Sequence, residues 1–210
     1  MTAHPATWRG GLANRWWTLA APGYDRAVGL VGWHRWLNVL VADVTSGRLL
    51  DIGCGPAYLA PGLLARGIGY AGVDRNAAMV ARARRRIAPS AGNGLVVRAD
   101  ATALPFRTGS FDIVLAAGLL GLLDLHSRQT ALREMARVTR GEIRLLEPFR
   151  RPGTPPHTLR AHVIGLVRDR PLDLTELAEA GLIPEMHGPP LLAGVYSRVH
   201  ALPRSGGVGR

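Results

Sequence analysis

The sequence predicts an α/β fold: a doubly wound, mostly parallel, seven-stranded Rossmann-like sheet with an N-terminal helical arm. The first observation is that short apolar runs alternate with helical segments from residue 48 onward, as in strand–helix–strand units. The second is that these runs are almost continuously apolar, which is typical of parallel strands covered on both faces. The third is the length of 210 residues, which suits one domain with an arm.

The elements follow in order along the chain. Residues 15–44 are helical in pattern, with a break near residues 21–23. Asn76 is suited to cap a helix, and a shortened turn at residues 139–141 is expected to lead into a strand. The expected helices cover residues 58–66, 77–87, 128–139, 158–168 and 173–180. The expected strands cover residues 48–52, 70–74, 94–100, 111–116, 142–147, 183–187 and 195–202, and the last two are expected to pair.

Composition divides the chain into three parts. Residues 1–47 are the helical arm, residues 48–203 are the sheet domain, and the Gly- and Ser-rich residues 204–210 are expected to be a disordered tail. The arm suits three roles: a lid over an apolar ligand, an anchor at a membrane interface, or plain packing against the sheet. It holds all five tryptophans of the chain, Trp8, Trp16, Trp17, Trp33 and Trp36.

Composition also excludes several kinds of chemistry. All 26 basic residues are arginines, so a lysine Schiff base and a P-loop lysine are ruled out. The single cysteine, Cys54, excludes an intrachain disulfide and a cysteine-rich zinc site, and no metal site is predicted. The net charge of +11 suits a polyanionic partner, but the arginines are scattered except within residues 82–86. We therefore expect an arginine-biased surface with no specific nucleic-acid partner.

The sequence carries no membrane or export signal that we recognise. No segment has 18 uninterrupted apolar residues, so no transmembrane helix is expected. The first residues lack the basic, apolar and small-residue regions of a signal peptide. The expected location is the cytoplasm.

Three acids lie at the carboxyl ends of the first three predicted strands: Asp51, Asp74 and Asp100. Ligands of open parallel sheets bind at the carboxyl edge, so three acids there predict a ligand site. Gly53 and Gly55 let the backbone turn tightly and approach a ligand closely. Asp74 lies 19 residues after Gly55, the spacing at which an acid accepts hydrogen bonds from ribose hydroxyls.

The ligand that fits best combines an amino acid with an adenosine. The sequence motif of dinucleotide-binding proteins requires a third glycine, and Tyr58 occupies that position here. That motif has no need of an acid before the glycines, whereas Asp51 is well placed for a ligand ammonium group. Asp100 is placed to accept from an adenine amino group.

These segments resemble the class I S-adenosylmethionine-dependent methyltransferases, especially the small bacterial ones similar to ubiquinone/menaquinone and phospholipid methyltransferases. Together they span about half of the chain, and their order and spacing match the family. The matching segments are residues 49–56 (LLDIGCGP), 72–76 (GVDRN), 98–106 (RADATALPF), 109–114 (GSFDIV) and 134–138 (EMARV).

The resemblance implies a role for each matching residue. Asp51, Gly53 and Gly55 would line the methionine end of the cofactor S-adenosyl-L-methionine, with Cys54 as a small residue inside the turn. Asp74 would bind the ribose hydroxyls. The remaining implied contacts are Arg75, Asp100 and Ala101 at the adenine, and Ala117 and Gly118 at the methionine through their backbone.

The catalytic residues stay unknown at the sequence level. Relatives often carry histidines just after the fourth strand, where this chain has none before His126. Methyl transfer needs little acid–base help when the acceptor is a good nucleophile, because the protein mainly aligns the reacting groups. The candidates for a base are Tyr24 and His126, with His157 and His162 as further histidines.

The predicted function is an S-adenosylmethionine-dependent methyltransferase acting on a small, apolar or lipid-like acceptor. One alternative is a phospholipid N-methyltransferase at the membrane surface, with peripheral contact through the N-terminal arm. A second alternative is a non-catalytic homologue that keeps the cofactor. A third, an RNA-modifying enzyme, rests on the net charge alone.

Overall fold

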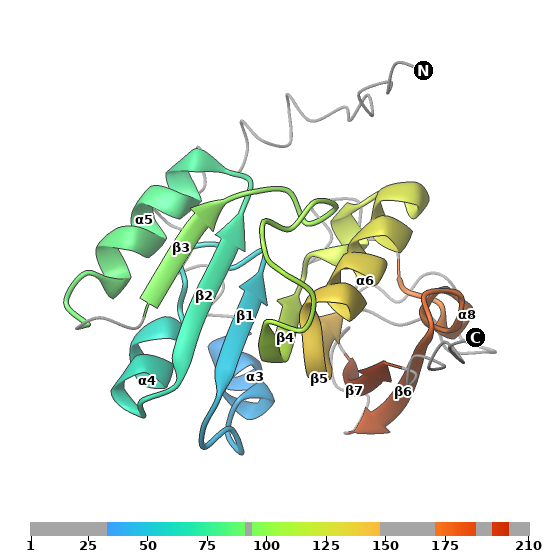
Figure 1. Ribbon diagram of the computed structural model, residues 1–210, viewed down its shortest axis with the longest axis horizontal. Helices are drawn as coiled ribbons and strands as arrows, with labels where there is room; N and C mark the ends of the chain where they lie inside the picture. The colour runs from blue at the N-terminus through green and yellow to red at the C-terminus, as the bar shows by residue number, and fades with distance from the viewer. Residues whose placement is uncertain (1–32, 91–93, 148–170, 188–194, 202–210) are drawn as a thin grey trace, which may run out of the picture.

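Seven strands form one sheet in the computed structural model (Figure 1). The structure describes residues 33–90, 94–147, 171–187 and 195–201. The strand order is β3-β2-β1-β4-β5-β7-β6. The strands are β1 (Arg48–Ile52), β2 (Gly69–Asp74), β3 (Gly94–Arg98), β4 (Phe111–Ala117), β5 (Thr139–Glu147), β6 (Leu182–His187) and β7 (Val195–Ala201).

Five neighbouring strands pair in parallel. They are β3, β2, β1, β4 and β5, whereas β7 pairs antiparallel with both β5 and β6. The prediction of an α/β, Rossmann-like fold is confirmed, and its parallel ladder holds five of the seven strands. The order reverses at β1, because β2 and β3 lie on one side of it and β4 and β5 on the other. Such a reversal opens a crevice at the carboxyl ends of the strands.

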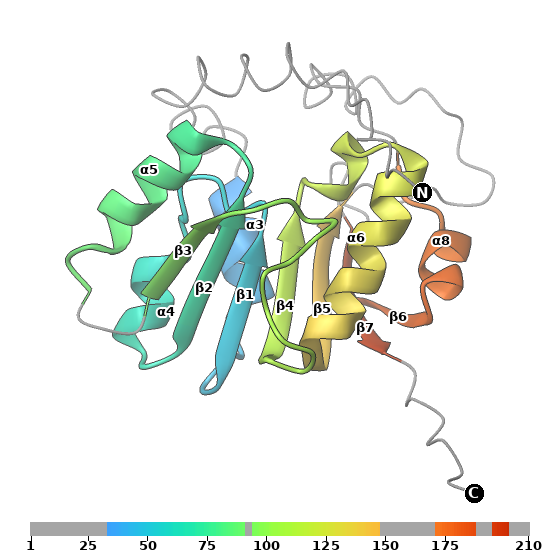
Figure 2. The same ribbon diagram turned by 45° about the horizontal axis from the view of Figure 1, so that its top comes forward.

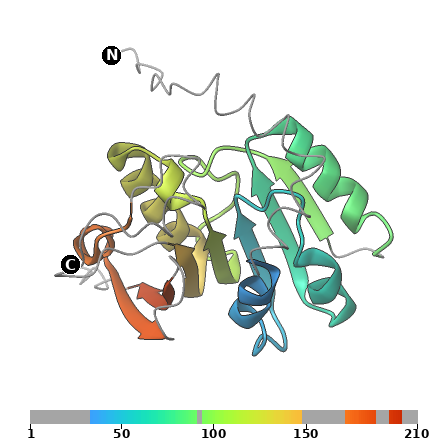
Figure 3. The same cartoon turned by 180° about the vertical axis from the view of Figure 1, so that it is seen from behind.

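Helices cover both faces of the sheet (Figure 2). One face carries α3 (Trp33–Leu40), which lies in front of the sheet in Figure 3, with α4 (Ala60–Ala65) and α5 (Ala77–Ile87). The other face carries α6 (Leu125–Val138) and α8 (Leu174–Glu179). Leu49 packs into the hydrophobic core on the face that carries α3, α4 and α5, and Leu50 packs into the core on the face that carries α6 and α8. Successive residues of a buried strand thus enter opposite cores, which explains the continuous apolar runs.

Side-chain caps set the starts of the helices. Asn76 caps α5 as predicted, because its Oδ1 accepts hydrogen bonds from Ala78 N at 2.9 Å and Met79 N at 3.1 Å. The predicted start of the next helix at residue 128 was wrong. α6 begins at Leu125 because the Asp124 side chain accepts from Ser127 N at 2.9 Å.

The expected turn at residues 139–141 was also wrong. β5 begins at Thr139, directly after α6, and Thr139 pairs with Phe111. The register then shifts between Phe111 and Ile113, so this part of the ladder is irregular. Gly141 fits there because an added Cβ would lie only 2.2 Å from the Asp112 carbonyl oxygen. A backbone contact with the neighbouring strand therefore replaces the expected turn.

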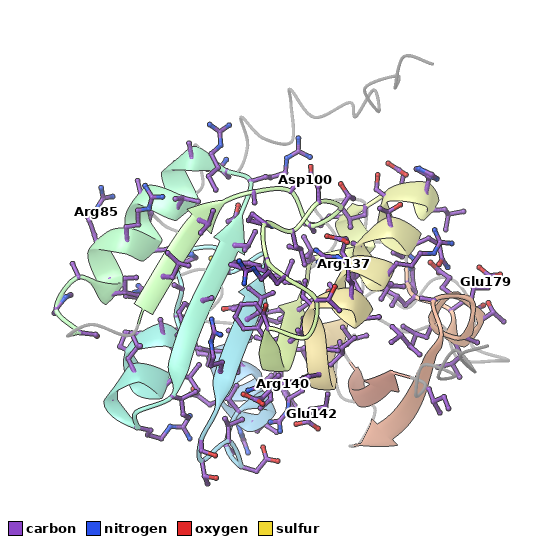
Figure 4. The ribbon with its side chains drawn as sticks, viewed as in Figure 1. Arg85, Asp100, Arg137, Arg140, Glu142 and Glu179 are labelled. Carbon is purple, nitrogen blue, oxygen red and sulfur yellow. The ribbon has the colours of Figure 1, made fainter. Side chains whose placement is uncertain are left out.

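Asp112 ties the amino ends of three strands together. Its carboxylate accepts from Arg48 N of β1 at 2.9 Å and pairs with Arg140 of β5 at 2.7 Å. Figure 4 shows Arg140 at the end of the sheet opposite Asp100. The residue therefore organises the end of the sheet that lies away from the candidate site.

Several predicted features lie outside the described residues. They include the arm up to residue 32, the helix at residues 158–168 and the tail at residues 204–210. The described end of the arm, α3, buries Leu37 and Leu40 against the sheet. Among the described residues, none of the helices is both long enough and apolar enough to cross a bilayer.

Gly141→Ala is expected to destabilise the protein by about 2 kcal/mol or more, because the new methyl group overlaps a backbone carbonyl that is held in the ladder. Gly62→Ala is the matched control, since nothing lies within 4 Å of its added Cβ and it lies in α4. That control is expected to be neutral or to stabilise by up to about 1 kcal/mol. Chemical denaturation of both variants measures the difference, and equal stabilities would contradict the proposed backbone contact.

Candidate functional site

The glycine turn after β1 is bonded directly to β2. The backbone amides of Gly53 and Cys54 both donate to the Val73 carbonyl oxygen, at 2.8 and 3.0 Å. Gly53 and Gly55 have φ values of +72° and +51°, in the left-handed region that glycine adopts without strain. The turn therefore lies across the carboxyl ends of two neighbouring strands.

Asp74 ends β2 and is held by this turn. One carboxylate oxygen accepts from Gly55 N at 3.0 Å, and the other accepts from Asn76 N at 2.8 Å. Burial raises the pKa of Asp74 above its ordinary value, while the bonds from Asn76 and Gly55 oppose that rise. A carboxylate has about four acceptor positions, so two backbone donors leave capacity for a ligand.

Asp51 is the most deeply buried acid of the site. It lies within β1 with 6% of its surface exposed, and Tyr70 donates its hydroxyl hydrogen to Asp51 Oδ2 at 2.9 Å. Burial raises the pKa of Asp51 to about 7, the bond from Tyr70 opposes this rise, and the charge of Asp74 adds to it. Placing two acids side by side is unfavourable without a cation, so the arrangement suits a positively charged ligand group.

A cavity opens beside Asp51 and the first residues of the glycine turn. Four of the predicted cofactor residues line it: Asp51, Gly53, Cys54 and Ala117. Its other lining residues come from α3 and from the segment after the glycine turn, and are mainly apolar or aromatic. They are Trp33, His34, Leu37, Pro56, Tyr58 and Leu59.

The His34 ring makes a contact that was not predicted from the sequence. It stacks on the ring of Tyr58, with centroids 3.8 Å apart and planes 3° from parallel. Asn38, one helical turn further along α3, donates to the Tyr58 hydroxyl at 3.4 Å. These contacts close one side of the cavity with a helix that precedes the sheet in sequence. Helical periodicity placed Trp33 on the packing face, but gave no signal for His34.

Other predicted residues lie away from the cavity lining. Asp100 is exposed two residues beyond the end of β3, and Figure 4 shows it on the following loop. Its side chain accepts from the Thr102 amide at 3.0 Å and hydroxyl at 2.8 Å. Arg75 is exposed, Ala101 is partly buried beside Asp100, and His126 is exposed in the first turn of α6. Three base candidates, Tyr24, His157 and His162, lie outside the described residues.

Glu147 supports the site and was missed by the sequence reasoning. It ends β5, is 0% exposed, and accepts from Leu119 N at 2.7 Å and Leu120 N at 2.9 Å. Arg128 of α6 donates to the Leu120 carbonyl oxygen at 2.9 Å. These bonds fix the loop that follows Ala117. The available signal was a charged residue at the end of an apolar run, where a buried charge requires partners.

Comparisons with known proteins find a methyltransferase domain within the chain. Residues 49–142 match the family described as "Methyltransferase domain". An uncharacterized methyltransferase of Mycobacterium marinum is 37% identical over 105 residues, which are 50% of this chain and 40% of that protein. The demethylmenaquinone methyltransferase of Mycobacterium tuberculosis H37Rv is 33% identical over 129 residues, which are 61% and 50% of the two chains.

A solved structure shows the same fold. The S-adenosylmethionine-dependent methyltransferase SibL has a TM-score of 0.64 at 20% sequence identity, covering 81% of this chain and 56% of that one. The chain spans about half the length of the curated relatives it matches. The resemblance drawn from the sequence is confirmed to this extent: residues 49–142 match a methyltransferase domain, and the fold is that of a solved S-adenosylmethionine-dependent methyltransferase. The cofactor of such a domain is S-adenosylmethionine.

Asp51→Asn is expected to stabilise the ligand-free protein at neutral pH. The fold raises the pKa of Asp51 from 3.8 to about 7. The protonated Asp51 side chain therefore contributes fully to the stability of the fold below pH 3.8, and this contribution is lost as the pH rises through about 7. Asparagine keeps an acceptor for Tyr70 and carries no charge. Denaturation at several pH values should show that the free energy of unfolding of the variant, minus that of the wild type, grows by a few kcal/mol between about pH 4 and pH 8. A difference independent of pH would contradict the raised pKa.

Proposed function

We propose that this protein is an active methyltransferase that binds S-adenosylmethionine along the carboxyl ends of β1, β2 and β4. One observation carries the proposal: the glycine turn that follows Asp51 donates a hydrogen bond to Asp74, and Asp51 and the turn line one cavity. The site fits the cofactor because it combines a closely approachable backbone with one buried acceptor, Asp51, and one partly buried acceptor, Asp74. The cofactor offers a matching ammonium group and a pair of ribose hydroxyls.

Each residue is assigned a part of the cofactor. Asp51 binds the ammonium group, and Asp74 accepts from the ribose hydroxyls. Gly53 and Gly55 allow close approach of the backbone, and Cys54 provides a small side chain between them. The assignment for the adenine is Arg75, Asp100 and Ala101, and for the methionine backbone contacts it is Ala117 and Gly118.

The chain's own contribution to the reaction is binding, alignment and exclusion of water. The bound cofactor supplies an electrophilic methyl group on a sulfonium. Glu147 holds the loop after β4 in place, so that loop is shaped before a ligand arrives. Trp33 and Leu37 form an apolar wall that keeps water from the reacting groups. No base is assigned to the acceptor.

The acceptor is a small, apolar or lipid-like molecule. Trp33, Leu37 and Leu59 give the cavity an apolar side, which suits an apolar ligand. The demethylmenaquinone methyltransferases among the relatives, at 33% identity, support a lipid-like acceptor. Contact with a membrane surface through the arm stays a prediction, because the arm up to residue 32 lies outside the described residues.

Asp74→Ala tests the assignment. Titration calorimetry with S-adenosylhomocysteine should show binding to the wild type and an affinity lowered about 10- to 100-fold in the variant. The loss follows because ribose hydroxyls would lose a charged acceptor. The measurement is repeated with S-adenosylmethionine.

Asp112→Ala is the matched control, because it removes an acid from the opposite end of the sheet. It should lower stability and leave the affinity unchanged. Absence of binding of either ligand to folded wild-type protein would overturn the proposal. Binding without methyl transfer to any member of an apolar and quinone-like acceptor panel would instead favour a non-catalytic cofactor-binding protein.

A further inference from the structure

Tyr70 reaches the cofactor site through space left by a glycine. In the parallel register of β1 and β2, Asp51 is opposite Gly72, and Tyr70 lies two residues earlier on β2. An added Cβ on Gly72 would lie 2.9 Å from Cys54 Sγ and 3.0 Å from the Tyr70 hydroxyl oxygen. The missing side chain therefore provides the room in which Tyr70 reaches Asp51.

The resulting cluster is isolated from bulk water. Tyr70 is 2% exposed and Asp51 is 6% exposed. Burial, followed by the charge of Asp51, raises the pKa of Tyr70 further above its ordinary value, so its hydroxyl keeps its proton and acts as a donor. The hydrogen bond of 2.9 Å uses one of the two Asp51 oxygens. The rest of the carboxylate's acceptor capacity is left for a ligand in the cavity that Asp51 lines.

We propose that Tyr70 is a positioning residue for the ammonium group of the cofactor: it orients the Asp51 carboxylate and favours its ionised form, so that cofactor binding expels a proton from Asp51. This inference rests on the proposed function. It adds a residue from outside the matching glycine and acid motifs, and it makes binding depend on pH in a defined direction.

The direction follows from the groups that face Asp51. They are Tyr70 and Asp74 of β2 and Cys54 of the glycine turn. Burial raises the pKa of Asp51 to about 7 and that of Cys54 above its ordinary value, so the Cys54 thiol keeps its proton near neutral pH. His34 and Tyr58 are the other titratable side chains that line the cavity. A ligand ammonium group favours the ionised acid. Binding at or below about pH 7 therefore requires Asp51 to lose a proton, and affinity falls as the pH falls.

Tyr70→Phe separates this role from simple packing, because it keeps the ring and removes only the hydroxyl group. The affinity for S-adenosylhomocysteine is measured between about pH 5.5 and pH 8.5. A plot of the logarithm of the wild-type affinity against pH should change slope near pH 7, which we call the break, and the affinity should fall about tenfold for each pH unit below it. In the variant the break should move upward by about one pH unit, so that binding at pH 7 is several-fold weaker. Dividing the affinity of the variant by that of the wild type at each pH removes the effect of the ligand's own ionisable groups.

Two further variants complete the test. Asp51→Asn should bind weakly, with no break in this range. Thr139→Val removes a buried hydroxyl that accepts from Gly141 N at the opposite end of the sheet, and should keep the wild-type break. Calorimetry in two buffers of different ionisation enthalpy should show about half a proton released by the wild type near pH 7 and none by Asp51→Asn.

The outcomes distinguish the inference from the function it rests on. A wild-type profile without a break would overturn the role of Tyr70 while leaving the cofactor site in place. An equal loss at every pH in Tyr70→Phe would do the same, since that is the effect of packing alone. Absence of binding at any pH in every protein would overturn both the inference and the proposed function.

Discussion

The hydrogen bonds between the glycine turn and the end of β2 are the constraint on which the site depends. Two successive amides, from Gly53 and Cys54, share the Val73 carbonyl oxygen, and the next amide donates to Asp74. This geometry requires positive φ values at Gly53 and Gly55, so a side chain at either position would strain the turn. Because the turn joins β1 to β2, it also fixes the distance between Asp51 and Asp74. The backbone therefore holds the Asp74 charge where it adds to the rise in the pKa of Asp51.

The site is acidic in a protein whose net charge is +11. These facts agree because exposed arginines are screened by water and salt, and the neighbouring Arg75 lowers the pKa of Asp74 less than burial raises it. Burial raises the pKa of both carboxyls, so ionised acids make the ligand-free fold less stable near neutral pH. A ligand that supplies an ammonium group removes that cost. The ionised acids thus lower the stability of the ligand-free protein and raise its affinity for a cation at the same pH.

The sequence predicted what depends on local patterns and missed what depends on contacts between distant segments. The apolar runs located the strands, and Asn76 marked the start of α5. The irregular start of β5 depends on Asp112 from another strand, so the pattern at residues 139–141 was misread as a turn. Within the site, Asp51 and the glycines followed from spacing. His34 did not, because its partner Tyr58 lies in a different segment.

Glu147 explains how the loop after β4 is held in place. Its buried carboxylate accepts from the amides of Leu119 and Leu120, and Arg128 donates to the Leu120 carbonyl oxygen. Arg128 is itself buried and paired with Glu176 of α8 at 2.9 Å. The polar backbone of the loop is therefore satisfied from inside the domain. Since all of these bonds are made within the domain, the loop after β4 forms with the fold and does not depend on cofactor binding.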